Sequence, residues 1–191
     1  MCETNSFSGG GLRGVSDTFL GALWTLNYML LLAAYGCCGV NIETGVNQLG
    51  FVSCYSPIQD DDKGNNSAGI PYYGMLAFAE ARRECNQIVA LDVPASAQRL
   101  TAYALGEAGR VVSAAVINRG VSDVHVSLKG LGLRGELKAL RMIAPDELST
   151  TGVTLGDAAV DENGRWGPKR WERVAPAEIL VPKMSAVIVR G

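Results

Sequence analysis

The sequence opens with Met1-Cys2-Glu3-Thr4-Asn5-Ser6-Phe7-Ser8-Gly9-Gly10-Gly11, an acidic residue followed by small polar residues and a run of glycines. Consecutive glycines allow the backbone to adopt positive φ angles and let a ligand approach its amides. A carboxylate held beside such a loop is suited to chemistry on a polar substrate. The alternative is a frayed terminus, because disorder concentrates at chain ends.

The region after the glycine loop predicts a helix and then a strand. Ser16 is a candidate N-cap, and Asp17 in the first turn suits the positive end of the helix dipole. Apolar residues then occupy nearly every side of the helix through Tyr35, which indicates burial on several sides, and Gly36 is suited to end it. Residues 38–43 follow as a short strand. This order is typical of a strand–loop–helix–strand unit.

Composition and charge narrow the class of protein. The chain has 191 residues, of which 48% are hydrophobic and 19% charged, as in globular proteins. A net charge of −2, without any Lys- or Arg-rich run, argues against a nucleic-acid partner. No secretory signal is recognisable after Met1. Residues 19–40 are long enough to span a bilayer, but Thr25, Asn27 and several glycines interrupt them, so a buried helix and strand is favoured over a membrane span.

The residues that commonly bind metals form no ligand set in the sequence. His125 lies in an alternating stretch without a His or Cys partner at ligand spacing. Asp60, Asp61 and Asp62 are candidates for calcium, but they lack the spacing of an EF-hand loop, so a solvated loop tip is predicted. Five cysteines without a Cys-x-x-Cys pair predict buried free thiols, in a reducing compartment or in a protein that uses no disulfides. No metal or organic cofactor is predicted.

The pattern changes after Asn86. Before this point Ile70-Pro71-Tyr72-Tyr73 begins a predicted helix, whose solvent-facing end holds Glu80, Arg82, Arg83 and Glu84. Beyond it, alternating apolar residues predict strands over residues 87–93, 100–105, 110–118, 121–128, 136–143 and 184–189. Short strands at this spacing indicate an antiparallel β-sandwich. Trp166 and Trp171 are candidates for stacking on a sugar, or they cap the edge of the sheet.

We therefore predict an α+β fold in two parts, with an α/β part over residues 1–85 and a β-sandwich domain over residues 86–191. The first part contains at most two strands and two helices, whereas a parallel barrel needs eight strands and about 250 residues. Two strands cannot close a barrel or cover their own edges. The chain is therefore expected to be a fragment, or a remnant, of a longer protein.

Several segments resemble glycoside hydrolase family 79, which contains β-glucuronidases and heparanase-like enzymes. The most specific is residues 2–11, quoted above, followed by Gly14-Val15-Ser16-Asp17-Thr18-Phe19 and Ala22-Leu23-Trp24. Further matches are Gly36-Cys37-Cys38-Gly39-Val40-Asn41, Tyr55-Ser56-Pro57-Ile58, Pro71-Tyr72-Tyr73-Gly74 and the strand over residues 112–118, so the resemblance covers nearly the whole chain. The family has a (β/α)8 barrel followed by a β-sandwich. The resemblance thus implies that residues 1–85 are the C-terminal remnant of a catalytic barrel.

The resemblance also implies roles for individual residues. Glu3 matches the catalytic nucleophile at the end of the seventh barrel strand. Gly9 and Gly10 match the loop whose amides help to hold the uronate carboxylate, a role that suits bare amides on a glycine loop. The other residues assigned to substrate binding are Asn5, Ser8, Glu43 and Tyr55. Two of these depart from the family, because many members carry an aromatic residue in place of Ser8 and a histidine in place of Glu43.

The implied function is hydrolysis of O-glycosyl bonds in uronate-type glycans with retention of configuration, and a carbohydrate is the expected partner. Retention requires a nucleophile and an acid/base about 5–5.5 Å apart. In the family the acid/base comes from an earlier strand, so the isolated chain is predicted to be inactive. The acidic side chain of Glu43 would repel a substrate carboxylate. Glu43 is near Glu3 if the two strands that carry them are adjacent. The alternative function is a non-catalytic β-sandwich that serves as an accessory or carbohydrate-binding module.

Overall fold

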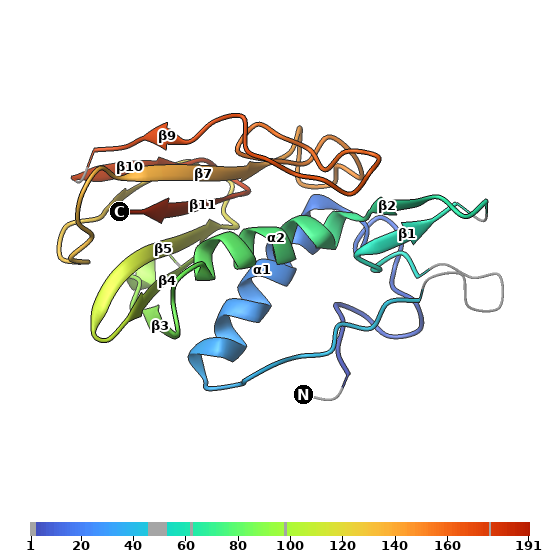
Figure 1. Cartoon of the computed structure of the whole chain (residues 1–191), viewed down its shortest axis with the longest axis horizontal. Coiled ribbons are helices and arrows are strands. Elements are labelled where there is room, and N and C mark those ends of the chain that lie inside the picture. Colours follow the sequence, from blue (N-terminus) through green and yellow to red (C-terminus); the bar gives the residue numbers. More distant parts are fainter. Residues whose placement is uncertain (1–2, 46–52, 62, 98, 176) are drawn as a thin grey trace.

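The computed structural model describes residues 3–45, 53–61, 63–97, 99–175 and 177–191. It is an α+β fold made mostly of antiparallel sheets, with two α-helices, α1 (Phe19–Ala34) and α2 (Ile70–Arg82) (Figure 1). A 3₁₀ turn at Ala95–Ala97 lies between the first two strands of the large sheet. None of the helices in the described part of the chain is long and apolar enough to cross a membrane.

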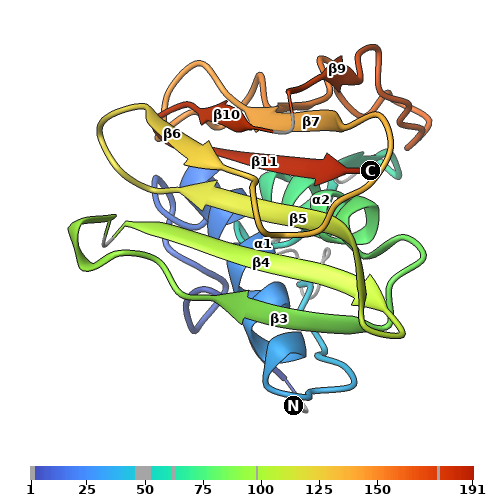
Figure 2. The same cartoon turned by 90° about the vertical axis from the view of Figure 1, so that its left-hand side faces the viewer.

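A seven-stranded antiparallel sheet forms the centre of the molecule. Its strand order is β3-β4-β5-β11-β7-β8, and β9 also pairs with β7. The strands are β3 (Gln87–Leu91), β4 (Leu100–Glu107), β5 (Arg110–Asn118), β7 (Lys138–Ile143), β8 (Thr154–Leu155), β9 (Glu172–Arg173) and β11 (Ser185–Arg190). A second sheet pairs β6 (Val124–Ser127) with β10 (Glu178–Val181) and lies across one face of the large sheet, with the helices on the other face (Figure 2).

Both faces of the large sheet are buried, and the side chains alternate between two cores as the pleat requires. Ile117 and Ile188 belong to the core shared with the helices, together with Phe19, Leu23 and Leu26 of α1. The adjacent residues along the same strands, Val116, Val187 and Val189, belong to the core under the small sheet. Ile179 and Val181 of β10 complete this second core. The strands therefore form a two-sheet sandwich, as predicted. The helices cover the face of the large sheet that is turned away from the small sheet.

The two helices cross at very short range. A Cβ atom on Gly74 of α2 would lie 2.4 Å from the Ala22 carbonyl oxygen and 2.9 Å from the Leu26 amide nitrogen of α1. Only a residue without a side chain permits such an approach of two backbones. The start of α2 near a proline was predicted correctly. The end of α1 was also predicted correctly, and the Gly36 amide there donates to the Ala33 carbonyl.

The predicted N-cap of α1 is wrong. The helix begins at Phe19 with Thr18 as the N-cap residue, and no side chain caps it. Instead the first amides donate to a loop of the sandwich part, Phe19 N to Ser149 O (2.9 Å) and Leu20 N to Glu147 O (3.2 Å). Ser16 Oγ accepts from the Leu12 amide (3.1 Å), so it stabilises the preceding turn. The free amides of the helix are thus satisfied by tertiary contacts, which local sequence does not encode.

The structure corrects further predictions about side-chain burial and about the region between the two helices. Glu80, placed on the solvent-facing end of α2, is buried and pairs with Arg83. Cys54 and Cys85 are buried as expected, whereas Cys37 and Cys38 are exposed, and Cys2 lies outside the described residues. A hairpin of β1 (Ile58–Asp60) and β2 (Asn66–Ala68) occupies part of a region predicted as loop.

His125 lies on β6, as predicted, and its Nδ1 is 2.8 Å from Glu178 Oε1 on β10. The predicted strands of the sandwich part are present with shifted ends. Residues 121–128 shorten to β6, residues 136–143 shorten to β7, and residues 100–105 lengthen to β4. The proposed boundary between residues 85 and 86 stays a prediction.

Candidate active site

The segment around Glu3 pairs in parallel with the segment that follows α1. Thr4 N donates to Asn41 O (3.0 Å) and Glu43 N donates to Thr4 O (3.0 Å), which makes a parallel bridge between Thr4 and Ile42. Of the strand predicted over residues 38–43, only Ile42 is assigned to this bridge. The two segments nevertheless lie side by side, as the predicted strand–loop–helix–strand unit requires.

The bridge places polar residues from both segments on one face. Successive residues of an extended chain point to opposite sides. Glu3 and Asn5 therefore lie on the face opposite Thr4, and Glu43, which follows Ile42, lies on that same face. Thr4 Oγ1 is 2.9 Å from the hydroxyl of Tyr28 on α1, which shows that its face is turned toward the helix. Glu3, Asn5 and Glu43 are therefore directed away from α1.

A small hydrogen-bond network links these residues to the loop that begins at residue 53. Asn5 Nδ2 donates to the Glu43 carbonyl oxygen (2.7 Å), and the Tyr55 hydroxyl donates to Glu43 Oε2. Burial raises the pKa of Tyr55 above its ordinary value, and its hydrogen bond to Glu43 acts in the same direction. At neutral pH, Tyr55 is therefore a neutral donor that fixes the Glu43 carboxylate in one orientation.

The glycine loop packs against the same segment. Gly9, Gly10 and Gly11 adopt φ angles of 64°, 90° and 94°, which is the conformation predicted for the glycine run. The Cys54 amide donates to the Gly10 carbonyl (2.8 Å). A Cβ on Gly11 would lie 2.6 Å from the Cys54 sulfur, so this position tolerates no side chain in the present packing. Glu3, Ser8 and Gly9 are exposed, while Gly10 is buried.

The structure thus brings Asn5, Glu43 and Tyr55 together, and Glu3 precedes Thr4 on the same extended segment as Asn5; sequence reasoning had proposed all four residues. It missed two neighbours. Asn41 is in parallel register with Glu3, one residue before the Ile42 bridge. Ser6 Oγ is buried and has no hydrogen-bond partner among the described residues. The alternation Asn41-Ile42-Glu43 beside Glu3-Thr4-Asn5 could have indicated Asn41, whereas nothing in the sequence marks Ser6.

The described residues include no group of three or more His, Cys, Asp or Glu side chains that could hold a metal ion. In the acidic loop, Asp61 accepts hydrogen bonds from the Lys63 and Asn65 amides at 2.9 and 3.1 Å, and from Asn65 Nδ2 at 2.8 Å. The Asn65 side chain and these amides lower the pKa of Asp61. Asp62 lies outside the described residues.

Comparison with solved structures identifies the fold. A 4-O-α-L-rhamnosyl-β-D-glucuronidase from Fusarium oxysporum matches 99% of the chain with a TM-score of 0.75 at 21% identity. The catalytic domain of the GH30 xylanase C from Talaromyces cellulolyticus matches 98% with a TM-score of 0.57 at 13% identity, and a GH51 arabinofuranosidase from Xanthomonas axonopodis matches 91% with a TM-score of 0.54 at 16% identity. The chain has a glycoside hydrolase fold.

The chain spans less than half of the length of each of these three structures. The chain spans 42% of the Fusarium enzyme, 37% of the xylanase domain and 35% of the arabinofuranosidase. No protein-family model and no curated protein matches the sequence.

Proposed function

We propose that this chain is the C-terminal part of a retaining glycoside hydrolase related to the β-glucuronidases of family 79. Residues 1–85 supply the last strand–helix units of a (β/α)8 barrel, and residues 86–191 form the β-sandwich domain that follows it. The parallel bridge between Thr4 and Ile42, joined through α1, supports this proposal because barrel strands are parallel and connected by helices. The partial coverage of three glycoside hydrolases supports it as well.

Glu3 acts as the nucleophile in this proposal. One carboxylate oxygen attacks the anomeric carbon while the bond to the leaving oxygen breaks, which gives a glycosyl–enzyme ester. An acid/base residue donates its proton to the leaving oxygen and then removes a proton from the water that hydrolyses the ester. The observation that carries this role is the position of Glu3 on the polar face of the bridge, directed away from α1, where a substrate could reach it.

Glu43 is a poor candidate for the second catalytic group. Its Oε2 already accepts the hydrogen bond from Tyr55, and its backbone is held by Thr4 and Asn5. A general acid must be free to reach the leaving oxygen, whereas these contacts hold the Glu43 side chain against Tyr55. We assign Glu43 to substrate binding and place the acid/base on a strand that the present chain does not contain.

The Ser6 hydroxyl, which has no hydrogen-bond partner in the part of the chain that the structure describes, supports a site completed by further groups. A buried polar atom without a partner costs free energy, commonly about 1–3 kcal/mol. Substrate, water or a neighbouring strand would satisfy Ser6 Oγ beside Asn5. Gly9 and Gly10 remain the proposed amides for a uronate carboxylate, with Ser8 beside them.

Two experiments test the proposal. The transcript that carries this chain is expected to continue in frame upstream of Met1 and to encode further strand–helix units with a second carboxylate at a strand end. Its full-length product should hydrolyse an aryl β-glucuronide, and Glu3→Gln should abolish this activity. The isolated chain should be inactive. A stop codon directly upstream, or hydrolysis by the isolated chain that is lost in Glu3→Gln, would overturn the proposal in this form.

A further inference from the structure

An open groove lies at the C-terminal end of α2, away from the residues proposed for catalysis. It has a volume of about 450 Å³, which is within the range of about 300–1,000 Å³ that small-molecule sites occupy. Trp171 borders it, with Arg83 and Glu84 from the end of α2 and Lys138 and Arg190 from the sheet. Glu3, Asn5, Glu43 and Tyr55 do not line it.

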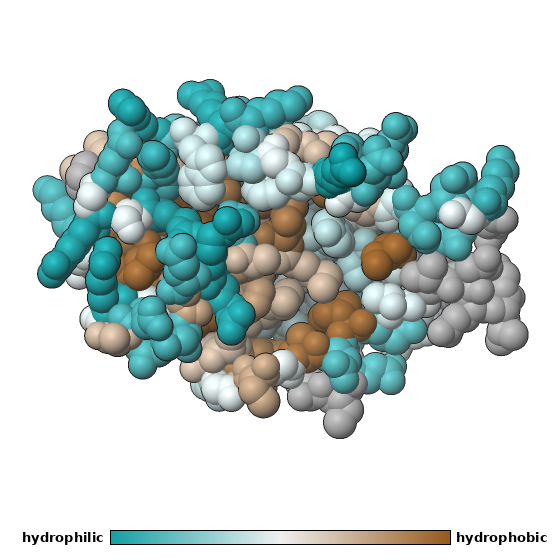
Figure 3. Space-filling model, in the orientation of Figure 1, coloured by the Kyte–Doolittle hydropathy of each residue, from teal (hydrophilic) through white to brown (hydrophobic). Residues whose placement is uncertain are grey.

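The groove exists because the large sheet extends beyond the end of α2. Arg190 pairs in register with Ser113 on one side and with Lys138 on the other, so a polar row crosses three strands. The positions two residues away on these strands, Ile188 and Leu140, lie on the same face of the sheet. Both are fully buried in the core shared with the helices. The face thus changes from apolar to polar beyond the last turn of the helix, and hydrophilic side chains gather at this end of the molecule (Figure 3).

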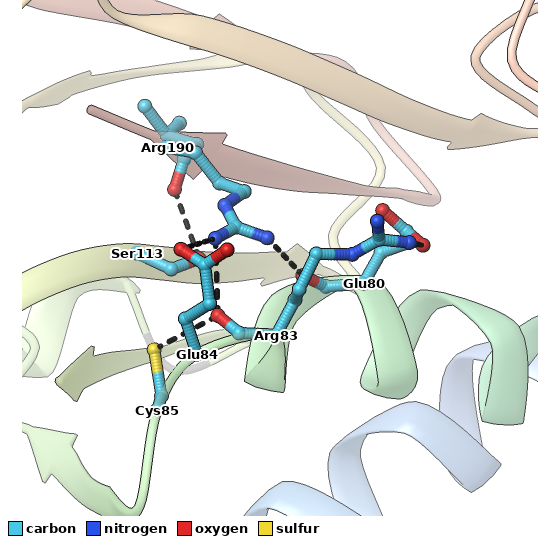
Figure 4. A network of polar contacts seen from close by, with 7 residues as sticks. Glu80, Arg83, Glu84, Cys85, Ser113 and Arg190 are labelled. Carbon is cyan, nitrogen blue, oxygen red and sulfur yellow. Dashed lines mark hydrogen bonds and ion pairs between the residues drawn. The ribbon is translucent and has the colours of Figure 1, made fainter. Parts of the chain in front are cut away.

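Every charged side chain of the groove has a partner of opposite charge. Arg83 Nη2 pairs with Glu80, and Arg190 Nη2 lies 3.4 Å from Glu84 Oε2 (Figure 4). On the sheet, Lys138 Nζ lies 3.5 Å from Glu136 Oε2. The groove therefore contains three acidic and three basic side chains, so the charges of its side chains cancel.

The two tryptophans named as sugar-stacking candidates differ in this structure. Trp166 donates its indole N–H to the Leu155 carbonyl (3.1 Å), and its ring packs against the core shared with the helices and does not line the groove. Trp171 also packs against that core, but it borders the groove. The Trp171 side chain is therefore held partly by the protein core and remains partly accessible from the groove.

We propose that this groove binds a neutral glycan chain, with a pyranose ring stacked on Trp171. The carbon-bound hydrogens of a pyranose form an apolar face that suits an indole ring, and its hydroxyls suit the surrounding carboxylate and guanidinium groups. Because the charges are already paired, an anionic sugar gains no uncompensated cation here. The groove is open at the surface, so a polymer can pass through it. This inference is independent of catalysis at Glu3.

Isothermal titration of the purified chain with cellohexaose, xylohexaose and trigalacturonic acid tests the proposal. We expect at least one neutral hexasaccharide to bind, and trigalacturonic acid to bind more weakly. Trp171→Ala should weaken binding roughly tenfold or more, which is about 1.4 kcal/mol. Trp171→Phe should retain most of it, because an aromatic face remains.

Trp166→Ala is the matched control, since it also removes a core-packed indole but lies outside the groove. Thermal unfolding of each variant confirms that the fold persists. The proposal is overturned if neither neutral hexasaccharide binds, if the acidic sugar binds most tightly, or if Trp166→Ala and Trp171→Ala weaken binding equally.

Discussion

The Tyr55 hydroxyl donates to the Glu43 carboxylate, and this contact connects the segment after α1 to the loop that holds the glycine run. Tyr55 is 5% exposed, and Gly11 packs directly against its ring and backbone. The geometry of the polar face around Glu3 therefore depends on a buried tyrosine that is distant in sequence. This dependence can be measured on the isolated chain, without any catalytic activity.

Tyr55→Phe should loosen the segment around Glu43 while the sandwich keeps its stability. The variant loses one hydrogen bond to a partly buried carboxylate, for which about 1 kcal/mol of local stability is expected. Hydrogen exchange of the Glu43 amide, which donates to Thr4, reports this change. Tyr35→Phe is the control, because Tyr35 is 81% exposed. Unchanged exchange at Glu43 in Tyr55→Phe would show that the contact does not hold the segment.

Gly74→Ala should destabilise the whole chain. The added methyl group would meet the backbone of α1 at Ala22 and Leu26, so the helices must separate, and overpacking of this kind costs about 1–3 kcal/mol. Urea denaturation measures the free energy of unfolding. Gly167→Ala is the matched control, since no atom of the described residues lies within 4 Å of its Cβ position. Equal stability of the two variants would contradict the close helix crossing.

Arg190→Met should destabilise the end of α2 against the sheet. The Arg190 guanidinium donates to the Arg83 carbonyl (3.0 Å) and the Glu80 carbonyl (3.4 Å), which are among the carbonyls that a helix C-terminus leaves unpaired (Figure 4). We expect a loss of about 1–3 kcal/mol in the free energy of unfolding. Glu84→Gln removes only the exposed ion pair and should cost less than about 1 kcal/mol. A larger effect in Glu84→Gln would assign the stabilisation to the ion pair.

Stability should decline at alkaline pH, in part through Tyr103. Burial raises the pKa of Tyr103 above its ordinary value of 10.0, so the folded state holds the phenolic proton more tightly than the unfolded state. This contribution is complete below pH 10 and is lost as the pH rises toward the folded-state pKa. The buried thiols of Cys54 and Cys85, whose pKa values burial also raises, begin a similar decline above about pH 9.

Tyr103→Phe separates these contributions. Its Oη donates to Asn27 Oδ1 (3.0 Å), so the variant starts from a lower stability at neutral pH. Above pH 10, however, its free energy of unfolding should fall less steeply than that of the unmodified chain, because no phenol titrates at this position. Urea denaturation between pH 8 and 11 measures both slopes. Parallel curves throughout would remove Tyr103 from the explanation.

The sequence predicted the elements whose residues repeat with a clear period. β5 was predicted over residues 110–118 from an alternating stretch bounded by turn residues, and α2 was marked by a proline near its start. Glu43 was expected near Glu3 only on the condition that their two strands are adjacent, and the parallel bridge between Thr4 and Ile42 brings these segments side by side. These features depend on local pattern, which the chain encodes directly.

Tertiary features were not predictable in this way. α1 is capped by carbonyls of Glu147 and Ser149, more than a hundred residues away, so its local sequence points to the wrong cap. Glu80 is a charged residue that was predicted to face solvent, yet it is buried; Arg83 pairs with its carboxylate and Arg190 donates to its main-chain carbonyl. The Tyr55–Glu43 contact joins two loops, and no periodicity marks such a contact.

Covalent labelling of Glu3 tests the proposed catalytic role most directly. The full-length product of the transcript is treated with a 2,4-dinitrophenyl 2-deoxy-2-fluoro-β-glucuronide, whose leaving group departs without a proton donor, so that labelling reports the nucleophile alone. Peptide mass spectrometry then locates the glycosyl ester. The proposal predicts the adduct on the peptide that contains Glu3 and no adduct in Glu3→Gln. Inactivation with the adduct on a different carboxylate, and Glu3 unmodified, would contradict it.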